Sequence, residues 1–133
     1  MWTNDSSSFL RKVLLADAVV SGATGLLLFL GAGILTALLD VPEDFLRYTG
    51  LSLIPFTGLV AFLATRAHPP RPAVWAVIVY NALWAVDSVL ILVAGWIAPS
   101  ALGYAFILAQ GVVVAILAEL QFIGLRRSVT ALA

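Results

Sequence analysis

The sequence predicts an all-α integral membrane protein, built as one antiparallel bundle of four transmembrane helices. Of its 133 residues, 62% are hydrophobic and 11% are charged. Ordinary soluble domains have about 45–50% apolar and about 25% charged residues. Four apolar runs also reach the roughly 20 residues needed to cross a hydrocarbon core about 30 Å thick. Composition and run length therefore indicate the same class of protein.

The four predicted spans cover about residues 13–39, 46–65, 73–96 and 101–125, within a single domain of residues 1–133. They are expected to be helices because lipid offers no hydrogen-bond partners to backbone groups and the runs lack the alternation of barrel strands. Left-handed packing near about +20° is the common crossing in such bundles. The first run is long enough to span with a tilt.

Turn-forming residues separate the runs. Asp40, Pro42 and the acids Glu43 and Asp44 predict a helix start, with proline in the first turn and acids near the positive end of the helix dipole. The proline-rich segment at 68–72 cannot continue a helix. Ala98-Pro99-Ser100 supplies another break, at which Ser100 is a candidate N-cap.

Basic residues predict the orientation, because short cytoplasmic loops are enriched in lysine and arginine. Six of them fall on one side of the predicted bundle: Arg11, Lys12, Arg66, Arg71, Arg126 and Arg127. The other side has Arg47 beside three acids. Both termini are therefore expected in the cytoplasm, and the short loops favour a multi-pass protein of a bacterial inner membrane.

The third predicted helix carries a stripe of polar and aromatic side chains. At 100° per residue its members fall within an arc of about 120°: Tyr80, Asn81, Trp84, Asp87 and Ser88. A carboxylate near the bilayer centre costs at least about 2.5–3.5 kcal/mol and normally faces the bundle interior or a wet cavity. Asp87 is therefore predicted to point inward, where it would carry a proton or attract a cation.

A second polar layer is predicted on the first and fourth helices. Asp17, Ser21 and Thr24 share one face of the first helix. On the fourth, Gly111, Ala115 and Glu119 follow the spacing of a close helix contact, which would place Glu119 at the depth of Asp17. The side chain of Gln110 projects from almost the opposite side of that helix, toward a neighbouring helix or another subunit.

Each of these residues also has a purely structural interpretation. Asp17 and Glu119 would then be shallow carboxylates that water, a backbone group or a loop arginine satisfies. Asp87 would be a protonated hydrogen-bond donor that fixes helix packing, and such bonds contribute only about 0.6 kcal/mol on average. Tyr80 and Trp84 would pack as ordinary aromatic residues.

The residue inventory argues against an enzyme and predicts neither a metal site nor a cofactor. His68 is the sole histidine, it lies in a loop, and the chain has no cysteine. Bis-histidine haem, HExxH zinc sites and Ser-His-Asp catalysis therefore lack necessary parts. The basic residues form no patch that would indicate nucleic-acid binding.

Three functional hypotheses remain open. In the first, the protein is a small membrane-embedded binding or transport module, with Asp87, Tyr80 and Trp84 receiving a hydrophobic or cationic small molecule. In the second, it is an accessory or scaffold subunit whose polar residues serve helix packing only. In the third, it binds an apolar ligand such as a lipid or quinone. Expected partners are membrane lipids and a second copy, with a homodimer favoured.

Overall fold

The computed structural model describes the backbone of residues 2–132 and the side chains of residues 8–127. Five helices follow one another along the chain: α1 (Trp2–Leu30), α2 (Ala32–Leu39), α3 (Glu43–Thr65), α4 (Arg71–Val93) and α5 (Ala101–Leu132). Four of them are long and apolar enough to cross a membrane. The predicted all-α bundle with four spans is therefore confirmed.

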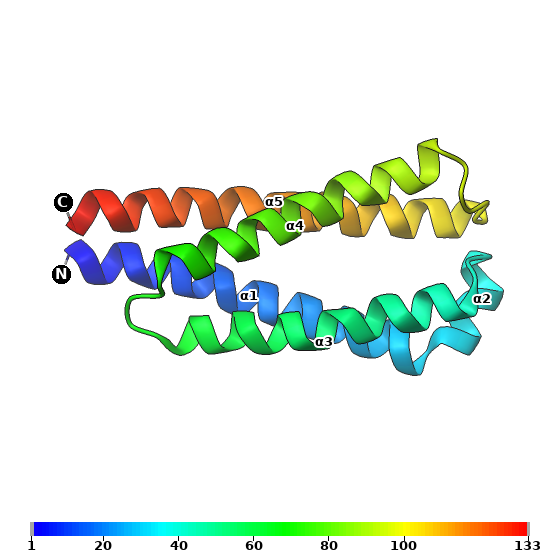
Figure 1. Cartoon of the computed structure of the whole chain (residues 1–133), viewed down its shortest axis with the longest axis horizontal. Helices are drawn as coiled ribbons and strands as arrows, with labels where there is room; N and C mark the ends of the chain where they lie inside the picture. The colour runs from blue at the N-terminus through cyan, green and yellow to red at the C-terminus, as the bar shows by residue number, and fades with distance from the viewer. Residues whose placement is uncertain (1, 133) are drawn as a thin grey trace.

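The long helices alternate in direction, so the start of α1, the α3–α4 connection and the end of α5 lie at one end of the molecule (Figure 1). This is the end that holds the six basic residues, and it is called the basic end below. The short α2 lies at the opposite end, called the α2 end (Figure 1). Both described chain termini thus lie at the basic end, as four spans require.

The first predicted span is wrong as one continuous helix, because the chain bends at Gly31. Gly31 separates α1 from α2 with φ −97° and ψ 12°. Its amide still donates to Leu27 O at 2.8 Å, and Leu35 N donates to Gly31 O at 2.9 Å. A Cβ on Gly31 would lie 2.7 Å from Leu27 O. The bend therefore needs glycine and retains the hydrogen bonds on both sides.

The second predicted span starts three residues too late. Asp40 ends α2 in the left-handed conformation, with φ 54° and ψ 45°. Pro42 then precedes α3 directly, so that Glu43 and Asp44 occupy the first turn. Acids there interact favourably with the unpaired amides of the helix start. Pro55 lies inside α3, where it removes one backbone donor.

The third predicted span runs too far and the fourth stops too early. Helix α4 ends at Val93, and Gly95 turns the chain with φ 72°. Trp96, the predicted last residue of the third span, therefore belongs to the α4–α5 connection. Helix α5 continues to Leu132.

Ser100 confirms the predicted cap and also connects α5 to α2. Its hydroxyl oxygen accepts a hydrogen bond from Gly103 N at 3.1 Å. The same hydroxyl donates to Leu38 O at 2.9 Å, and Ser100 N donates to Leu39 O at 2.9 Å. Carbonyls at the end of α2 thereby gain partners that the helix itself cannot supply.

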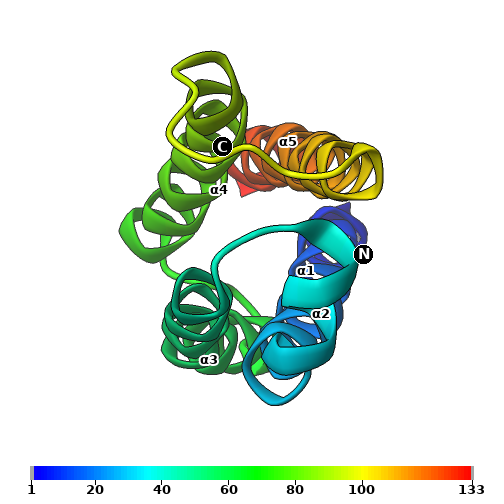
Figure 2. The ribbon, with the colours of Figure 1, turned by 90° about the vertical axis from the view of Figure 1, so that its right-hand side faces the viewer.

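The bundle is packed unequally. Helices α1 and α3 pack against each other extensively, as do α4 and α5, and α1 joins the two pairs through α5. Helices α3 and α4 contact each other little, although they are consecutive. They diverge from their connection at the basic end toward the α2 end (Figures 1 and 2).

The buried apolar residues accordingly form two clusters. One lies toward the basic end and includes Leu10, Leu14, Leu63, Val74 and Leu125. The other lies toward the α2 end and consists of Leu28, Ala32, Leu39, Val41 and Leu46. Polar side chains and cavities occupy the region between them.

The α1–α3 contact predicts a sharp difference between two glycines of α3. A Cβ on Gly50 would lie 2.6 Å from Gly25 O and 2.7 Å from Phe29 N, whereas a Cβ on Gly58 meets no atom within 4 Å. We expect Gly50→Ala to lower the free energy of unfolding by about 1–3 kcal/mol, because backbone must move. Unfolding in mixed detergent micelles with increasing dodecyl sulfate measures this.

Gly58→Ala is the matched control and should change the free energy of unfolding by no more than about 0.5 kcal/mol. Equal losses in the two variants would contradict the close α1–α3 packing.

Candidate functional site

A buried hydrogen-bond network surrounds Asp17 in the middle of α1. Ser21 Oγ donates to Asp17 Oδ1 at 2.7 Å. Asp17 Oδ2 accepts two bonds, from Asn81 Nδ2 on α4 at 2.8 Å and from Gln121 Nε2 on α5 at 2.7 Å. Asn81 Nδ2 also donates to Gln121 Oε1 at 3.0 Å. The carboxyl group thus joins three helices.

The network excludes solvent. Asp17 and Gln121 are 0% exposed, Asn81 is 2% exposed and Ser21 is 7% exposed. The described contacts of Asp17 contain no ion pair, and its three hydrogen-bond partners are neutral. The interpretation of Asp17 as a shallow, hydrated carboxylate is therefore wrong. Helix α1 starts earlier than predicted, so Asp17 lies about 22 Å along the helix from its start at Trp2.

Gln121 is the member of this network that the sequence prediction missed. It lies eleven residues after Gln110, which at 100° per residue is nearly the same helix face. Glu119, predicted in its place, is exposed, and so is Ala115. The expected Gly111–Ala115–Glu119 contact face is therefore wrong beyond Gly111, whose Cβ position is 3.3 Å from Ser88 Cβ.

A second polar contact joins α4 to α5 nearer the α2 end. Trp84 Nε1 donates to Gln110 Oε1 at 2.6 Å. Gln110 Nε2 donates to Ser88 Oγ at 2.8 Å and to Ile107 O at 2.6 Å. The predicted contact of Gln110 with a neighbouring helix is present, because both the oxygen and the nitrogen of its amide have partners on α4.

Aromatic rings connect α3 with α4 across the bundle. Phe56 stacks on Tyr80 with ring centroids 4.0 Å apart and an interplanar angle of 16°. Tyr80 in turn lies over Trp84, with centroids 5.9 Å apart and an angle of 28°. Tyr80 is the neighbour of Asn81 on α4, so this stack begins at the depth of the Asp17 network and continues through Trp84 toward the α2 end.

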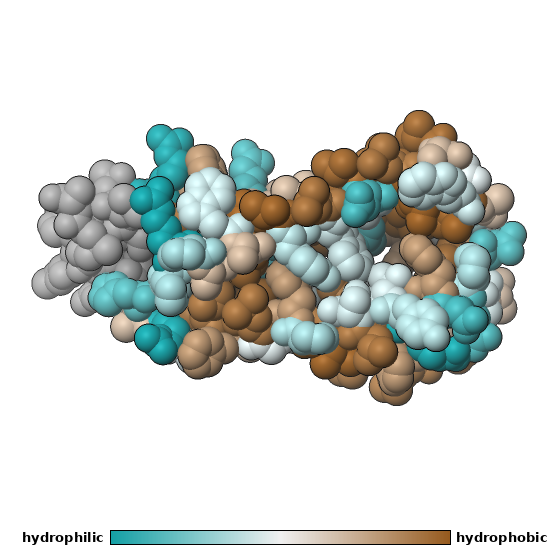
Figure 3. Space-filling model, viewed as in Figure 1, coloured by the Kyte–Doolittle hydropathy of each residue, from teal (hydrophilic) through white to brown (hydrophobic). Residues whose placement is uncertain are grey.

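Where α3 and α4 diverge, the structure contains a cavity of about 450 Å³, called the outer cavity below. Its wall takes residues from all five helices and from the α4–α5 connection. Phe45, Trp84, Trp96 and Phe106 supply aromatic surface, and Asp87, Ser88, Gln110, Thr24 and Thr49 supply polar groups. The space-filling view shows the surface hollowed near the α2 end (Figure 3).

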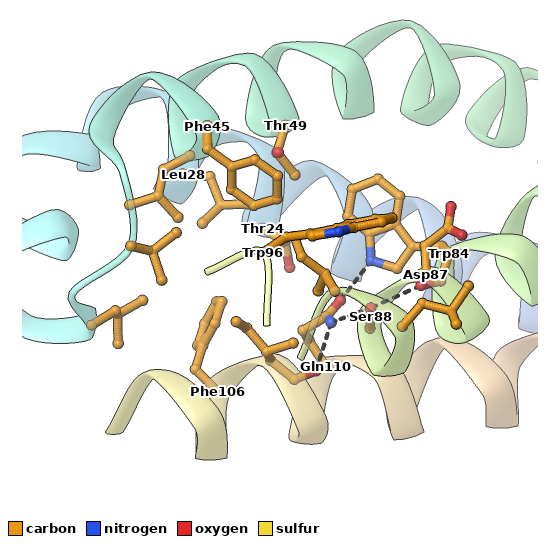
Figure 4. Close-up of a pocket in the computed structure, with 16 residues that line it drawn as sticks. Thr24, Leu28, Phe45, Thr49, Trp84, Asp87, Ser88, Trp96, Phe106 and Gln110 are labelled. Carbon is orange, nitrogen blue, oxygen red and sulfur yellow. Dashed lines mark hydrogen bonds between the residues drawn. The ribbon is translucent and has the colours of Figure 1, made fainter. Parts of the chain in front are cut away.

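Asp87 lies on the wall of the outer cavity and not in the helix interface. Its side chain is exposed, about 9 Å along α4 from the helix end at Val93. Figure 4 shows the carboxylate on the Trp84 side of the cavity, into which the rings of Trp84 and Trp96 project. Asp87 therefore faces the outer cavity and not the helix interface, and it lies closer to the end of its helix than predicted, because α4 ends at Val93.

The predicted stripe on α4 therefore divides between two sites. Asn81 belongs to the Asp17 network, and Ser88 binds Gln110. Asp87 and Trp84 line the outer cavity. Tyr80, Asn81 and Trp84 also line a smaller cavity of about 180 Å³, called the inner cavity below.

The arrangement has cavities of small-molecule size and a buried carboxyl group, but it offers little to a metal ion. Within residues 8–127, the structure contains no group of three or more histidine, cysteine, aspartate or glutamate side chains that could ligate a metal. Around Asp17, two amide nitrogens point at the carboxylate, so donors occupy positions where a metal site would present oxygens.

Comparison with protein-family models, with curated proteins and with solved structures finds no match for this chain.

The Asp17 network predicts a loss of stability when one of its amides is removed. In Gln121→Met the side chain keeps its length but can no longer donate to Asp17. We expect the free energy of unfolding to fall by about 1–3 kcal/mol, because a buried acceptor and Asn81 lose a partner. Unfolding in mixed micelles measures the change.

Glu119→Gln on the same helix is the control, since Glu119 is exposed. Its effect should stay within about 0.5 kcal/mol. A Gln121→Met variant as stable as the wild type would show that the network contributes nothing to the bundle.

Proposed function

We propose that the protein is a small non-enzymatic membrane protein that binds an amphiphilic, positively charged molecule in the outer cavity. The observation that carries this proposal is the single ionisable side chain, Asp87, on a wall of described residues that is otherwise uncharged and mostly apolar or aromatic. Such a wall favours a hydrophobic body, and a carboxylate beside it favours a cationic group on that body.

The dimensions of the outer cavity support a ligand of small-molecule size. Its volume of about 450 Å³ lies within the range of roughly 300–1,000 Å³ usual for small-molecule sites. Trp84 and Trp96 offer indole faces, which attract cations more strongly than other aromatic rings do. Gln110 and Ser88 bind each other and would orient a polar group of the ligand.

The proposal places the protein in a bacterial inner membrane with its basic end in the cytoplasm. The charge distribution supports this orientation, because six of the seven basic residues belong to the basic end. The outer cavity would then open between α3 and α4 in the outer half of the membrane, where a ligand arriving through the lipid meets Asp87 first. Transport, if it accompanies binding, would start from this cavity.

A neutral apolar ligand such as a lipid or quinone is the second candidate. The lining of the outer cavity supports a neutral ligand because most of the wall is apolar. Its apolar residues include Leu28, Leu39, Leu46, Leu90 and Ile91. It would leave Asp87 without a role in binding. The two candidates therefore differ in their dependence on this one carboxylate.

Binding of tetraphenylphosphonium to the purified protein tests the proposal. Asp87→Asn should weaken binding about tenfold, equivalent to about 1.4 kcal/mol, because the counter-charge is lost. Trp84→Leu should also weaken binding, since a cation–π contact contributes about 0.5–2 kcal/mol. Equilibrium dialysis with the labelled cation measures both changes.

Glu119→Gln, which removes an exposed carboxylate outside the outer cavity, should bind as the wild type does. Triphenylphosphine oxide serves as the neutral probe of similar shape. Equal affinity for the two probes, unaffected by Asp87→Asn, would instead support the apolar ligand. If the protein binds neither probe, the accessory-subunit hypothesis replaces both ligand-binding candidates.

A further inference from the structure

We propose that Asp17 is a proton-binding site, reached from the inner cavity through the hydroxyl of Ser21 and closed toward the basic end. This proposal does not depend on which molecule occupies the outer cavity. It concerns a carboxyl group that the proposed binding site does not use. Its basis is an asymmetry between the two oxygens of Asp17.

The two carboxylate oxygens have different partners. Oδ2 accepts from the amide nitrogens of Asn81 and Gln121, at 2.8 and 2.7 Å. Amide nitrogens can only donate, so Oδ2 cannot hold a proton in this arrangement. Oδ1 faces the hydroxyl of Ser21 at 2.7 Å. A hydroxyl both donates and accepts, so this bond persists with either direction of donation.

Protonation therefore requires only rotation of one hydroxyl. In the ionised state Ser21 donates to Oδ1. In the protonated state Oδ1 donates to Ser21 Oγ, and the serine hydrogen turns away, for which the carbonyl four residues earlier is a common acceptor in helices. Both states leave the bonds to Oδ2 intact, so neither disrupts the contacts between α1, α4 and α5.

The inner cavity brings water to the serine side of this bond. Its volume is about 180 Å³, and Ser21, Thr24, Tyr80, Asn81 and Gln110 are the polar residues that line it. At roughly 30 Å³ for each molecule in the liquid, several waters fit, and these side chains give them partners. Asp17 does not line the inner cavity, so Ser21 lies between it and this water.

Proton transfer along this route is balanced. A hydronium ion in the inner cavity donates its proton to Ser21 Oγ, while the original Ser21 proton passes to Asp17 Oδ1. One O–H bond forms and one breaks on the serine, and the products are water, serine and a neutral carboxylic acid. The reverse sequence returns the proton to the inner cavity.

The opposite direction is closed by apolar side chains. Between Asp17 and the basic end, Leu10, Leu14, Leu63 and Val74 are at most 1% exposed. Toward the α2 end, Thr24, Trp84 and Gln110 line both cavities and so form the partition between them. Trp84 and Gln110 are joined in this partition by a hydrogen bond of 2.6 Å, and parting that one contact connects the inner cavity to the outer cavity. Access to Asp17 is thus one-sided.

The other titratable groups leave Asp17 as the buried proton acceptor of this region. On α4, Tyr80 lines the inner cavity and Asp87 lines the outer cavity. On α5, Glu119 is exposed, and on α1 Arg11 donates to Ala64 O at 3.2 Å while Lys12 is exposed. The titratable groups of α3 lie in its first two turns, at the other end of the molecule: Glu43, Asp44, Arg47 and Tyr48.

Infrared difference spectroscopy of the protein in lipid vesicles tests the site without any ligand. Between about pH 9 and about pH 4, the wild type should show the C=O band of a buried carboxylic acid that Asp17→Asn lacks. Asp87→Asn and Glu119→Gln should retain that band. Absence of an Asp17-dependent band over this range would overturn the proposal.

Ser21 provides a second variant that preserves the carboxyl group. After a rapid pH jump, Ser21→Ala should protonate Asp17 at least about tenfold more slowly than the wild type, equivalent to about 1.4 kcal/mol in the barrier. Ser21→Thr, which restores a hydroxyl, should recover the rate. Equal rates in all three proteins would overturn the route through Ser21.

Sodium distinguishes a proton site from a cation site. Replacing potassium by sodium at constant ionic strength should leave the Asp17 band and its pH midpoint unchanged. A sodium-dependent midpoint would overturn the proposal in favour of a cation at Asp17. Failure of tetraphenylphosphonium to bind would leave these spectra unaffected, so the two proposals fail separately.

Discussion

The bundle depends on the need of one buried carboxyl group for hydrogen-bond partners. Asp17 lies within an apolar span, where an unsatisfied polar group would cost several kcal/mol. Ser21, Asn81 and Gln121 satisfy it from α1, α4 and α5. Hydrophobic contacts do not distinguish one helix rotation from another in lipid, since lipid tails are equally apolar. Directional hydrogen bonds do, so this network determines which faces of the three helices meet.

Helix α3 is outside the network, and the cavities follow from that. It packs on α1 through close backbone contact at Gly25 and Gly50, without a hydrogen bond to Asp17. At the basic end it is joined to α4 by a short proline-containing connection. At the other end, Ser100 attaches α2 to α5. Helices α3 and α4 therefore separate toward the α2 end, and aromatic side chains fill only part of the space.

Hydropathy predicted the number, type and approximate limits of the spans, because length and composition alone decide what crosses lipid. Helical periodicity also placed Asp17 and Ser21 together. It did not identify Gln121, because α5 is apolar around its circumference and sequence does not determine its rotation. The depth of Asp87 depended on where α4 ends, which the turn at Gly95 decides. Boundaries at single glycines are the least predictable features of such helices.

The bend at Gly31 has a further consequence for the fit between protein and bilayer. A straight helix from Trp2 to Leu39 would measure about 57 Å, nearly twice the hydrocarbon thickness. By turning at Gly31, the chain shortens the apolar run of residues 13–39 to residues 13–30 in α1, about 27 Å along the helix axis. Hydrophobic mismatch is thereby avoided without thinning the lipid or tilting one helix away from the others. Gly31 thus sets the length of the first span, and with it the membrane thickness that the bundle fits.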